Sequence, residues 1–333
     1  VKKLTSKPVV GVGCYTSPDA MVRVIRQGIM DMIGAARPSI ADPFLPKKIE
    51  EGRLDDIREC IGCNICVTGD MTMSLSRCTQ NSSFMEEWRK GWHPERMPAK
   101  KTDTRVLVIG AGPAGLSAAH RVGLRGYEVA LAEAGTELGG RVARECRLPG
   151  LSAWGRVRDY RAGQIGKMTN VNVYRDSRLT AADVLGFGFE HVAVATGATW
   201  RRDGIARYNL LPIAIAPAMP VFTPDDIMDG KRPSGHVVVY DDDHYYMGSV
   251  LAELLVQAGC RVTFLTPAAR AAEWSFNTLE QGLIQARLIE SGIDVRTNRG
   301  LAAIAAGGVT AACSYTGPES EIACDAVVLV TAR

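Results

Sequence analysis

The sequence carries little excess charge and has no long apolar run. Its 39 Lys and Arg against 36 Asp and Glu leave a net charge of +3 over 333 residues. That balance does not favour nucleic-acid binding or binding to a membrane surface. No apolar stretch reaches the roughly 18 residues of a membrane span, and the longest candidate, residues 210–222, contains three prolines. The N-terminus also lacks the apolar region of a signal peptide. We therefore expect no nucleic-acid partner and no membrane association.

The cysteine spacings of a disulfide framework are missing as well. Five of the nine cysteines are scattered singly along the chain, at Cys14, Cys146, Cys260, Cys313 and Cys324. Secreted disulfide scaffolds show a different usage, so we expect a reducing, cytoplasmic setting. The sequence does not begin with Met, which indicates a start inside a longer reading frame.

The composition, with 46% hydrophobic residues, 23% charged residues and 34 glycines, is typical of an α/β protein with two or three domains. Residues 8–13 and 30–38 are predicted to form short strands. Each precedes a predicted helix, over residues 18–28 and 43–52. Two such units cannot close a barrel alone, so residues 1–58 are interpreted as the last two βα units of a TIM barrel.

The remaining four cysteines are clustered. Cys60, Cys63 and Cys66 are separated by two residues each, and Cys78 follows eleven residues later. Three closely spaced thiolates with a distant fourth suit a 4Fe-4S cluster. A structural zinc site more often pairs two separate Cys-x2-Cys turns, and a zinc site or unligated core cysteines are the alternatives. We predict an iron–sulfur segment and linker over residues 59–100.

The stretch GAGPAG lies between a predicted strand and a predicted helix. Gly110 would permit a tight turn, Gly112 the close approach of a pyrophosphate, and Gly115 the packing of helix on strand. The pyrophosphate would meet the N–H groups of the helix N-terminus. Glu133, at the end of the next strand, would bind ribose hydroxyls, unless it is a solvated strand end. The pattern predicts an ADP or FAD site in a Rossmann-like domain over residues 101–232.

Two further segments are candidates for contact with the same ligand. Gly139, Gly140 and Arg141 would reach its phosphates, although they also fit a loop without a ligand. Thr196 and Gly197 follow a predicted buried strand and suit a close approach to the ligand, although they also fit a plain turn at a strand end.

A second Rossmann-like domain is predicted over residues 233–324, but its glycine loop is missing. The strand HVVVY is followed by DDDHYYMG. Three carboxylates would repel a pyrophosphate, and Tyr245 and Tyr246 would fill its space, so no NAD(P) is expected. We expect a solvated acidic turn rather than a metal site, with His244 as a loop residue rather than a catalytic one. A last strand over residues 325–333 is expected to return to the first nucleotide domain.

Glycine turns also end the two N-terminal strands. In barrels, such turns at the C-terminal ends of strands expose N–H groups to a phosphate. Gly11, Gly13 and Gly34 would allow this approach, and Arg37 would neutralise the phosphate. The alternative is that Arg37 is an ordinary ion-paired surface residue.

With these elements in order, the chain resembles the amine dehydrogenase branch of the Old Yellow Enzyme-like flavoproteins, the trimethylamine and dimethylamine dehydrogenases. The matching stretches include ARPSIADPFLP, DDIRECIGCNIC, CTQN, GWHPE, VLVIGAGPAG and DVLGFGFEHVAVATGA. The four-cysteine segment is shared with the related 2,4-dienoyl-CoA reductases. CTQN, GWHPE and the glycine-poor second loop are typical of the amine branch.

The resemblance implies a barrel that holds FMN, a 4Fe-4S cluster that takes its electrons, and an electron-transferring flavoprotein that receives them. By position, the four clustered cysteines would be the cluster ligands. Arg37 would meet the FMN phosphate, and the first glycine loop with Glu133 would hold ADP. The catalytic residues would precede Val1. At Ala332 the sequence has VTAR where the family tends to have VTGR.

We therefore expect an α/β chain made of a TIM-barrel remnant, a 4Fe-4S segment and two Rossmann-like domains of the FAD/NAD(P)-reductase type. It would be an interior fragment of a homodimeric amine dehydrogenase that demethylates tri- or dimethylamine, and it would be inactive alone. The alternatives are an NAD(P)H-dependent 2,4-dienoyl-CoA or enoate reductase and a non-enzymatic ADP-binding module.

Overall fold

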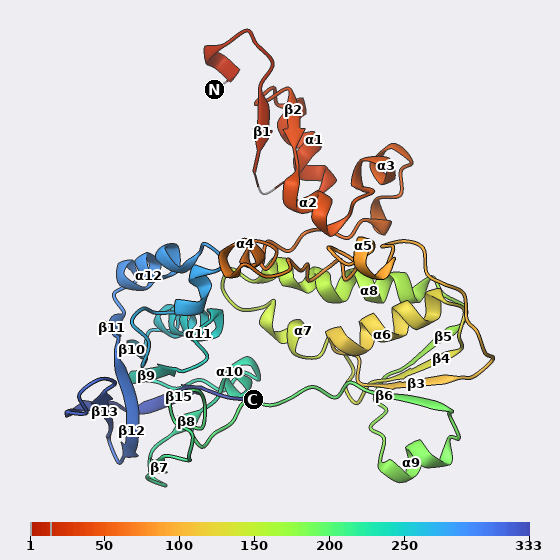
Figure 1. The fold of residues 1–333 in the computed structure, drawn as a ribbon. Helices are drawn as coiled ribbons and strands as arrows, with labels where there is room; N and C mark the ends of the chain where they lie inside the picture. The colour runs from red at the N-terminus through yellow and green to blue at the C-terminus, as the bar shows by residue number, and fades with distance from the viewer. Residues whose placement is uncertain (1, 14) are drawn as a thin grey trace. The chain divides into compact units, whose positions relative to one another are not determined.

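The computed structural model describes residues 2–13 and 15–333, so Cys14 lies outside the described residues. Figure 1 shows the order of the elements along the chain. The chain divides into two units, which comprise residues 1–146 with 153–197 and residues 147–152 with 198–333. Within the described ranges, no helix combines the length and the apolar character needed to cross a membrane.

The N-terminal part of the first unit alternates strands and helices, as the sequence predicts. β1 (Val10–Val12) and β2 (Met32–Gly34) pair in parallel. The second strand is shorter than residues 30–38 because a helix already begins at Ala36. The helices and 3-10 turns here are η1 (Lys2–Leu4), α1 (Pro18–Arg26), α2 (Ala36–Ala41), α3 (Leu45–Glu50) and η2 (Leu54–Asp56). α1 starts with a proline, which suits the first turn of a helix because its missing N–H would have no partner there.

A buried ion network joins this part to the linker after the cysteines. The Lys48 ammonium lies 2.6 Å from the Asp42 carboxylate, and their side chains are 1% and 0% exposed. The Arg58 guanidinium lies 2.6 Å from the Glu95 carboxylate. The Lys48 ammonium also lies 3.1 Å from the Glu95 carboxylate. Because a buried charge is costly without a partner, this contact fixes the linker against α3. Between them the chain is largely irregular, with only the short helices α4 (Thr68–Thr72) and α5 (Glu87–Lys90).

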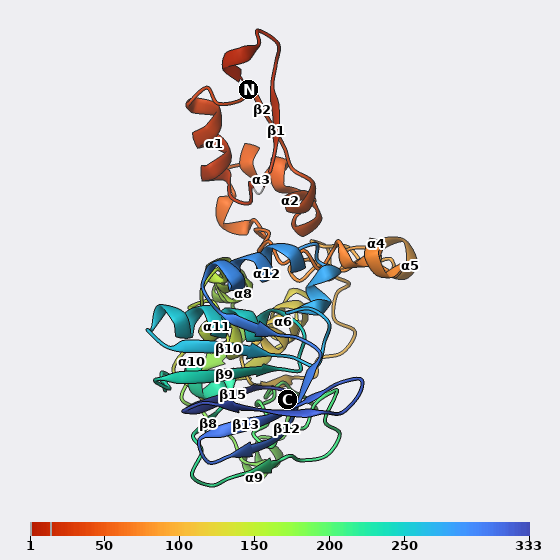
Figure 2. The same ribbon diagram turned by 90° about the vertical axis from the view of Figure 1, so that its left-hand side faces the viewer.

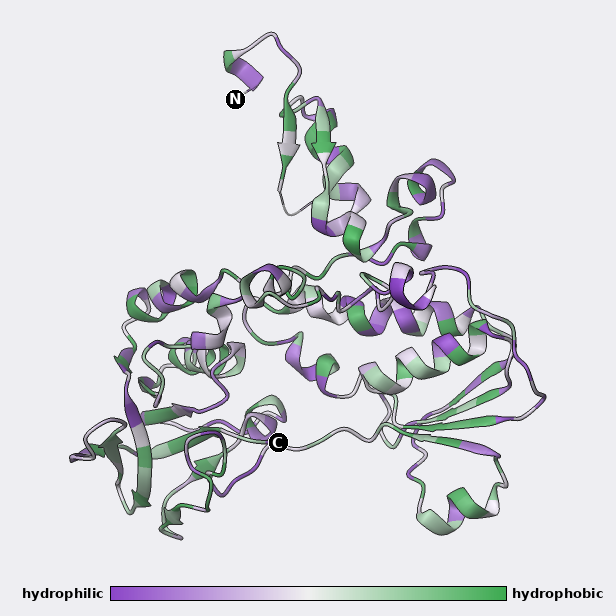
Figure 3. Cartoon of the chain, viewed as in Figure 1, coloured by the Kyte–Doolittle hydropathy of each residue, from purple (hydrophilic) through white to green (hydrophobic). Residues whose placement is uncertain are grey.

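The first nucleotide domain is a parallel sheet with helices. Its strand order is β5-β4-β3-β6. The strands are β3 (Val106–Ile109), β4 (Val129–Ala132), β5 (Val171–Tyr174) and β6 (His191–Val194). The helices are α6 (Pro113–Leu124), α7 (Arg141–Glu145), α8 (Arg156–Gly166) and α9 (Ala181–Gly186), with the 3-10 turn η3 (Ser152–Gly155). β3 and β4 are rich in β-branched and other apolar residues and are coloured mostly as hydrophobic in Figure 3. This sheet confirms a Rossmann-like domain.

The second unit contains a second, larger parallel sheet. Its order is β11-β10-β9-β15-β8, and Figure 2 shows β10, β9, β15 and β8 stacked in this order. The strands are β8 (Val221–Phe222), β9 (His236–Asp241), β10 (Arg261–Leu265), β11 (Asp294–Arg296) and β15 (Ala326–Val330). The helices are α10 (Pro224–Met228), α11 (Tyr246–Gln257) and α12 (Gln281–Glu290), with the 3-10 turn η4 (Glu273–Phe276).

A smaller sheet of order β14-β13-β12-β7 completes this unit. Its strands are β7 (Ala214–Ile215), β12 (Arg299–Ala305), β13 (Gly308–Cys313) and β14 (Glu319–Ala323). One hydrophobic core joins the two sheets of the unit, and it includes Tyr240, Leu265, Leu301, Val309 and Leu329. Their burial explains why β9 and β15 are almost continuously apolar.

Two boundaries differ from the sequence prediction. The final strand, β15, does not return to the first nucleotide domain, because it pairs with β9 and β8 in the second parallel sheet. Residues 198–232, which we assigned to the first nucleotide domain, belong to the second unit. The reason is that β7 and β8, which lie in this segment, pair with β12 and β15.

Candidate functional site

The four clustered cysteines come together in one cavity of the first unit. Cys60, Cys63, Cys66 and Cys78 line it together with apolar and polar neighbours that include Ile61, Ile65, Thr79 and Gln80. Ile61 is 6% exposed and packs against Val142 and Val157 of the first nucleotide domain. The cysteine segment is thereby anchored to α7 and α8. Among residues 2–13 and 15–333, no three His, Cys, Asp or Glu side chains converge closely enough to hold a single metal ion.

The polar groups around the thiols suit sulfur ligands that carry negative charge. The backbone N–H of Gly62 donates to Cys60 Sγ, and that of Asn81 donates to Cys78 Sγ, both at 3.4 Å. The Thr79 hydroxyl lies 3.1 Å from Cys63 Sγ. Burial raises the pKa of the Cys66 and Cys78 thiols, so unliganded thiols are held protonated there. A bound iron would deprotonate them, and N–H groups aimed at sulfur are a feature that tunes iron–sulfur clusters.

Three residues around this cavity were missed in the sequence analysis. Arg161 donates to the Gln80 side-chain carbonyl at 2.8 Å, and Arg156 donates to the Cys60 backbone carbonyl at 3.0 Å. A sequence signal for Arg161 does exist, because it lies four residues after Val157 and four before Ile165. The buried stripe of α8 therefore contains an arginine. The signal for Gln80 is its place in the CTQN stretch, directly after Thr79.

The first glycine loop has the close backbone contacts that its pattern predicts. Gly110 has a φ of 96°, and a Cβ there would lie 2.5 Å from the Ala195 carbonyl oxygen. A Cβ on Gly115 would lie 1.7 Å from the Gly110 carbonyl oxygen, so only glycine lets α6 approach β3 this closely. A Cβ on Gly112 would meet nothing within 4 Å. The open side of the loop is therefore at Gly112, where α6 begins.

The Glu133 carboxylate is held by this loop. It accepts the backbone N–H of Ala111 at 2.7 Å and that of Gly135 at 2.9 Å. Gly140 also reaches the loop, since a Cβ on it would lie 3.0 Å from Gly112 Cα. Arg141 is the first residue of α7, directly after Gly140.

Thr196 lies next to the glycine loop on the side of β6, because a Cβ on Gly110 would lie 3.3 Å from Thr196 Cα. Gly197 follows it with a φ of 75°. These residues meet at the carboxyl ends of β4, β3 and β6, where the strand order reverses. Ligands bind at such a point in doubly wound sheets.

The glycines of the N-terminal part lie at the ends of β1 and β2. Gly34 pairs opposite Val12, so Gly13 lies directly beyond this pair. Packing alone favours glycine at two of these positions, because a Cβ on Gly11 or Gly34 would overlap the side chain of Met30 or Val12. Arg37 lies in the first turn of α2 and donates a hydrogen bond to the Asn64 side chain. It also lines the cysteine cavity, so the structure places it beside the cysteines. Its expected contact with an FMN phosphate stays a prediction.

The acidic run of the second unit is buried, and the expectation of a solvated turn is wrong. The side chains of Asp241 and Asp242 are 0% and 1% exposed. Asp242 accepts the Tyr208 backbone N–H at 2.9 Å, and its carboxylate lies 3.0 Å from His244 Nε2. Burial raises the pKa of Asp241 to about 7. Asp242 thus has a partner from a distant segment, whereas Asp241 accepts the His244 backbone N–H of its own loop at 3.2 Å.

Aromatic side chains fill the rest of this loop. The rings of Tyr245 and Tyr246 meet edge to face at 4.9 Å between centroids, and Tyr245 meets Trp274 in the same way at 4.8 Å. His244 adopts a φ of 62°, which marks a turn position. The loop between β9 and α11 thus holds its own side chains where a dinucleotide loop would present N–H groups.

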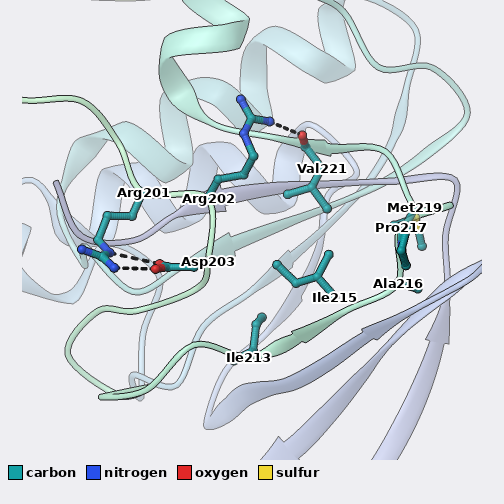
Figure 4. A pocket seen from close by; sticks show the side chains of 9 residues that line it. All are labelled: Arg201, Arg202, Asp203, Ile213, Ile215, Ala216, Pro217, Met219 and Val221. Atoms are coloured by element: carbon teal, nitrogen blue, oxygen red, sulfur yellow. Dashed lines mark hydrogen bonds and ion pairs between the residues drawn. The ribbon is translucent and has the colours of Figure 1, made fainter.

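A wide cavity of about 750 Å³ lies elsewhere in the second unit, lined by Arg201, Arg202, Asp203 and an apolar wall from Ile213 to Val221. Figure 4 shows Arg201 turned toward Asp203 and Arg202 turned toward the Val221 carbonyl. Arg202 also pairs with Asp226. Since both guanidinium groups have carboxylate partners, this cavity offers little to an anionic ligand.

Three segments match known domain families. Residues 1–56 match the NADH:flavin oxidoreductase / NADH oxidase family. Residues 108–170 match the NAD(P)-binding Rossmann-like domain. Residues 222–314 match the OYE-like second alpha/beta domain.

Several characterised proteins are similar over the entire chain. Dimethylamine dehydrogenase of Hyphomicrobium sp. (strain x) is 41% identical over 360 residues, covering 100% of this chain and 49% of that protein. The structure of histamine dehydrogenase from Rhizobium sp. 4-9 has a TM-score of 0.97 at 65% identity, covering 100% of this chain and 49% of that one. The structure of 6-hydroxypseudooxynicotine amine oxidase from Pseudomonas geniculata N1 has a TM-score of 0.95 at 55% identity, covering 99% and 50%.

These matches cover the FMN-family segment, the cysteine segment that follows it, and both nucleotide domains. The chain belongs to the Old Yellow Enzyme-like flavoprotein oxidoreductases that include the trimethylamine and dimethylamine dehydrogenases. It spans about half the length of the curated relatives it matches most fully.

Proposed function

We propose that this chain is the electron-relay and nucleotide-binding part of an amine dehydrogenase. The complete protein would oxidise a small methylated amine such as tri- or dimethylamine at an FMN. Its electrons would leave through a 4Fe-4S cluster to an electron-transferring flavoprotein. Relatives named as dehydrogenases of dimethylamine and histamine support the reaction class.

The observation that carries this proposal is the cysteine cavity. An all-sulfur donor set, two N–H groups aimed at sulfur and a buried apolar neighbour fit an iron–sulfur cluster. Cys60, Cys63, Cys66 and Cys78 would hold it. When bound, such a cluster supplies one-electron transfer between a two-electron donor and an outside acceptor. The protein fixes the ligands, limits water around them and donates hydrogen bonds to their sulfurs.

The glycine loop of the first nucleotide domain would hold ADP. Gly110, Gly112, Gly115 and Gly140 bring the backbone close to the ligand. Glu133, held by its two backbone N–H groups, would accept the ribose hydroxyls with its remaining lone pairs. Arg141, Thr196 and Gly197 would border the phosphates. The support for this placement is that all these segments meet at the switch point between β3 and β6.

Residues 1–58 would be the end of an FMN-binding TIM barrel. Their strands leave the apolar side chains of Val10, Val12 and Met32 at 54%, 74% and 49% exposure, and a barrel would cover such a surface. Gly11, Gly13, Gly34 and Arg37 would border the FMN phosphate. The match of residues 1–56 to the flavin oxidoreductase family supports this assignment.

The second nucleotide domain would not bind NAD(P). The buried carboxylates of Asp241 and Asp242 and the packed rings of Tyr245 and Tyr246 oppose a pyrophosphate there. This feature separates the proposal from an NAD(P)H-dependent 2,4-dienoyl-CoA or enoate reductase. It also leaves the outside flavoprotein as the electron acceptor.

The acceptor can be tested on the chain after anaerobic reconstitution with iron and sulfide. We expect the dithionite-reduced chain to give one electron to an electron-transferring flavoprotein in stopped-flow mixing, and to give none to NAD⁺. The control is the same mixing with a Cys78→Ser chain, which should transfer no electron. Reoxidation by NAD⁺ would instead favour the reductase, and a reduced chain that passes electrons to neither acceptor would favour an ADP-binding module.

A further inference from the structure

Arg161 is a buried cation in direct contact with the cysteine loop. Its side chain is 7% exposed on α8 of the first nucleotide domain. One guanidinium nitrogen donates to Gln80 Oε1 at 2.8 Å, and another donates to the Thr79 backbone carbonyl at 3.1 Å. Thr79 and Gln80 directly follow Cys78 in the sequence. Arg161 therefore holds the segment that carries the fourth thiol.

Gln80 also binds the backbone at the other end of the cysteine segment. Its side-chain amide donates to the Glu59 backbone carbonyl at 3.1 Å and to the Arg156 backbone carbonyl at 3.3 Å. Glu59 directly precedes Cys60. The two residues Arg161 and Gln80 thus tie both ends of the four-cysteine segment to each other and to α8.

The charge of Arg161 is not neutralised by an acid. In the part of the chain that the structure describes, no carboxylate lies within ion-pair distance of its guanidinium, and its hydrogen-bond acceptors are amide and peptide carbonyls. Burial lowers the pKa of Arg161, as do the nearby charges of Arg121 and Arg58. An arginine nevertheless stays charged at neutral pH. Because the group is buried, salt screens its field only weakly.

A fixed positive charge next to a cluster favours the state that carries one more electron. Net charge, hydrogen bonds and solvent exposure set the potentials of iron–sulfur clusters. Arg161 would act on two of these, through its own charge and through the Thr79 carbonyl and the Gln80 side chain that it binds. Thr79 also brings its hydroxyl to Cys63 Sγ.

We propose that Arg161 is a positioning residue that holds the Cys78 loop against α8 and raises the reduction potential of the cluster. The inference rests on the proposed function, because it requires that the four cysteines bind a cluster. A helix of the nucleotide domain, α8, would thereby help to set the reduction potential of the cluster.

The test is a redox titration of the reconstituted chain, with dithionite as reductant and the cluster followed by electron paramagnetic resonance. We expect Arg161→Met to lower the equilibrium constant for one-electron reduction about tenfold, which is about 59 mV. Arg161→Lys keeps the charge and loses the fork, so its shift should be smaller. Arg158→Met is the matched control, because Arg158 lies on the same helix and pairs with Glu137 and Asp159. It should not shift the potential.

A second variant keeps the test decisive if Arg161→Met loses the cluster. Gln80→Glu places a carboxylate on the Arg161 guanidinium, and it should lower the potential in the same direction. The variant keeps the contact with Arg161 and gives up the two hydrogen bonds that the amide donates to the Glu59 and Arg156 carbonyls, so its iron content is measured first. A wild-type potential in whichever of Arg161→Met and Gln80→Glu keeps full iron content would overturn the inference alone. A wild-type chain that binds no iron would overturn the proposed function and this inference with it.

Discussion

His244 and Asp242 form a buried pair in the loop between β9 and α11, with 3.0 Å between His244 Nε2 and Asp242 Oδ1. The pair lies directly after Asp241 at the carboxyl end of β9. Asp241, Asp243 and Arg207 are further charged groups near it. A loop that would bind a pyrophosphate in a reductase is thus occupied by its own ion pair.

The buried groups Asp241, Asp242 and His244 lead us to expect that the second unit loses stability as the pH rises. Burial alone would lower the pKa of His244, but the bond to Asp242 and the charge of Asp241 outweigh it, so that pKa is raised. Burial raises the pKa of Asp241 to about 7. Both groups hold protons more tightly when folded than when unfolded. Their combined contribution is therefore largest at low pH and is lost as the pH rises through about 7.

We expect the opening free energy of β9, from hydrogen exchange corrected for intrinsic rates, to fall by about 1–2 kcal/mol between pH 5 and pH 8. Asp241→Asn should flatten this dependence, because an amide has no proton to lose. The control is Asp294→Asn, at a half-exposed position of the same unit, which should keep the wild-type slope. A pH-independent wild type would show that these groups do not titrate in this way.

The Glu133 carboxylate should matter for nucleotide binding. Glu133→Gln leaves one acceptor oxygen for the N–H groups of Ala111 and Gly135, so one of them loses its partner. The neutral amide would also be a poorer acceptor for the ribose hydroxyls, and a lost hydrogen bond to a charged group corresponds to about 1.5–3 kcal/mol. We expect at least tenfold weaker ADP binding by calorimetry. Glu137→Gln, at an exposed position of the same loop, should bind ADP normally, and equal affinities for both variants would contradict this role.

Substitutions at two glycines of the first loop should have different effects, one on the stability of the fold and the other on ADP binding. Gly115→Ala forces a Cβ to within 1.7 Å of the Gly110 carbonyl, so we expect a markedly lower melting temperature. Gly112→Ala has free space in the fold and should melt like the wild type, yet bind ADP at least tenfold more weakly. Gly163→Ala, a helical position with free space, is the control and should raise stability by about 1 kcal/mol. Normal ADP binding by Gly112→Ala would place the ligand elsewhere.

The local elements were predictable because they follow from short-range patterns. The strand before Gly110, the helix after it and the position of Glu133 all lie within one βαβ unit, whose hydrophobic periods and glycines are legible in the sequence. The gathering of the four cysteines in one cavity was also predictable, because only two residues separate Cys60 from Cys63 and Cys63 from Cys66.

The errors arose where partners are distant in the sequence. Asp242 is buried because Tyr208, more than thirty residues earlier, donates to it, and no local pattern shows such a partner. β15 enters the second sheet between β9 and β8, and strand order is a property of the whole domain. Arg161 was overlooked because an arginine on a helix is usually solvated, whereas this one meets the carbonyls that follow Cys78.

The account depends most on what the four cysteines bind, and the iron and sulfide content of the chain measures this directly. After anaerobic reconstitution and removal of free metal, we predict about four irons and four acid-labile sulfides per chain, with both lost in Cys60→Ser. A chain that carries one zinc, no sulfide and no iron would contradict the account.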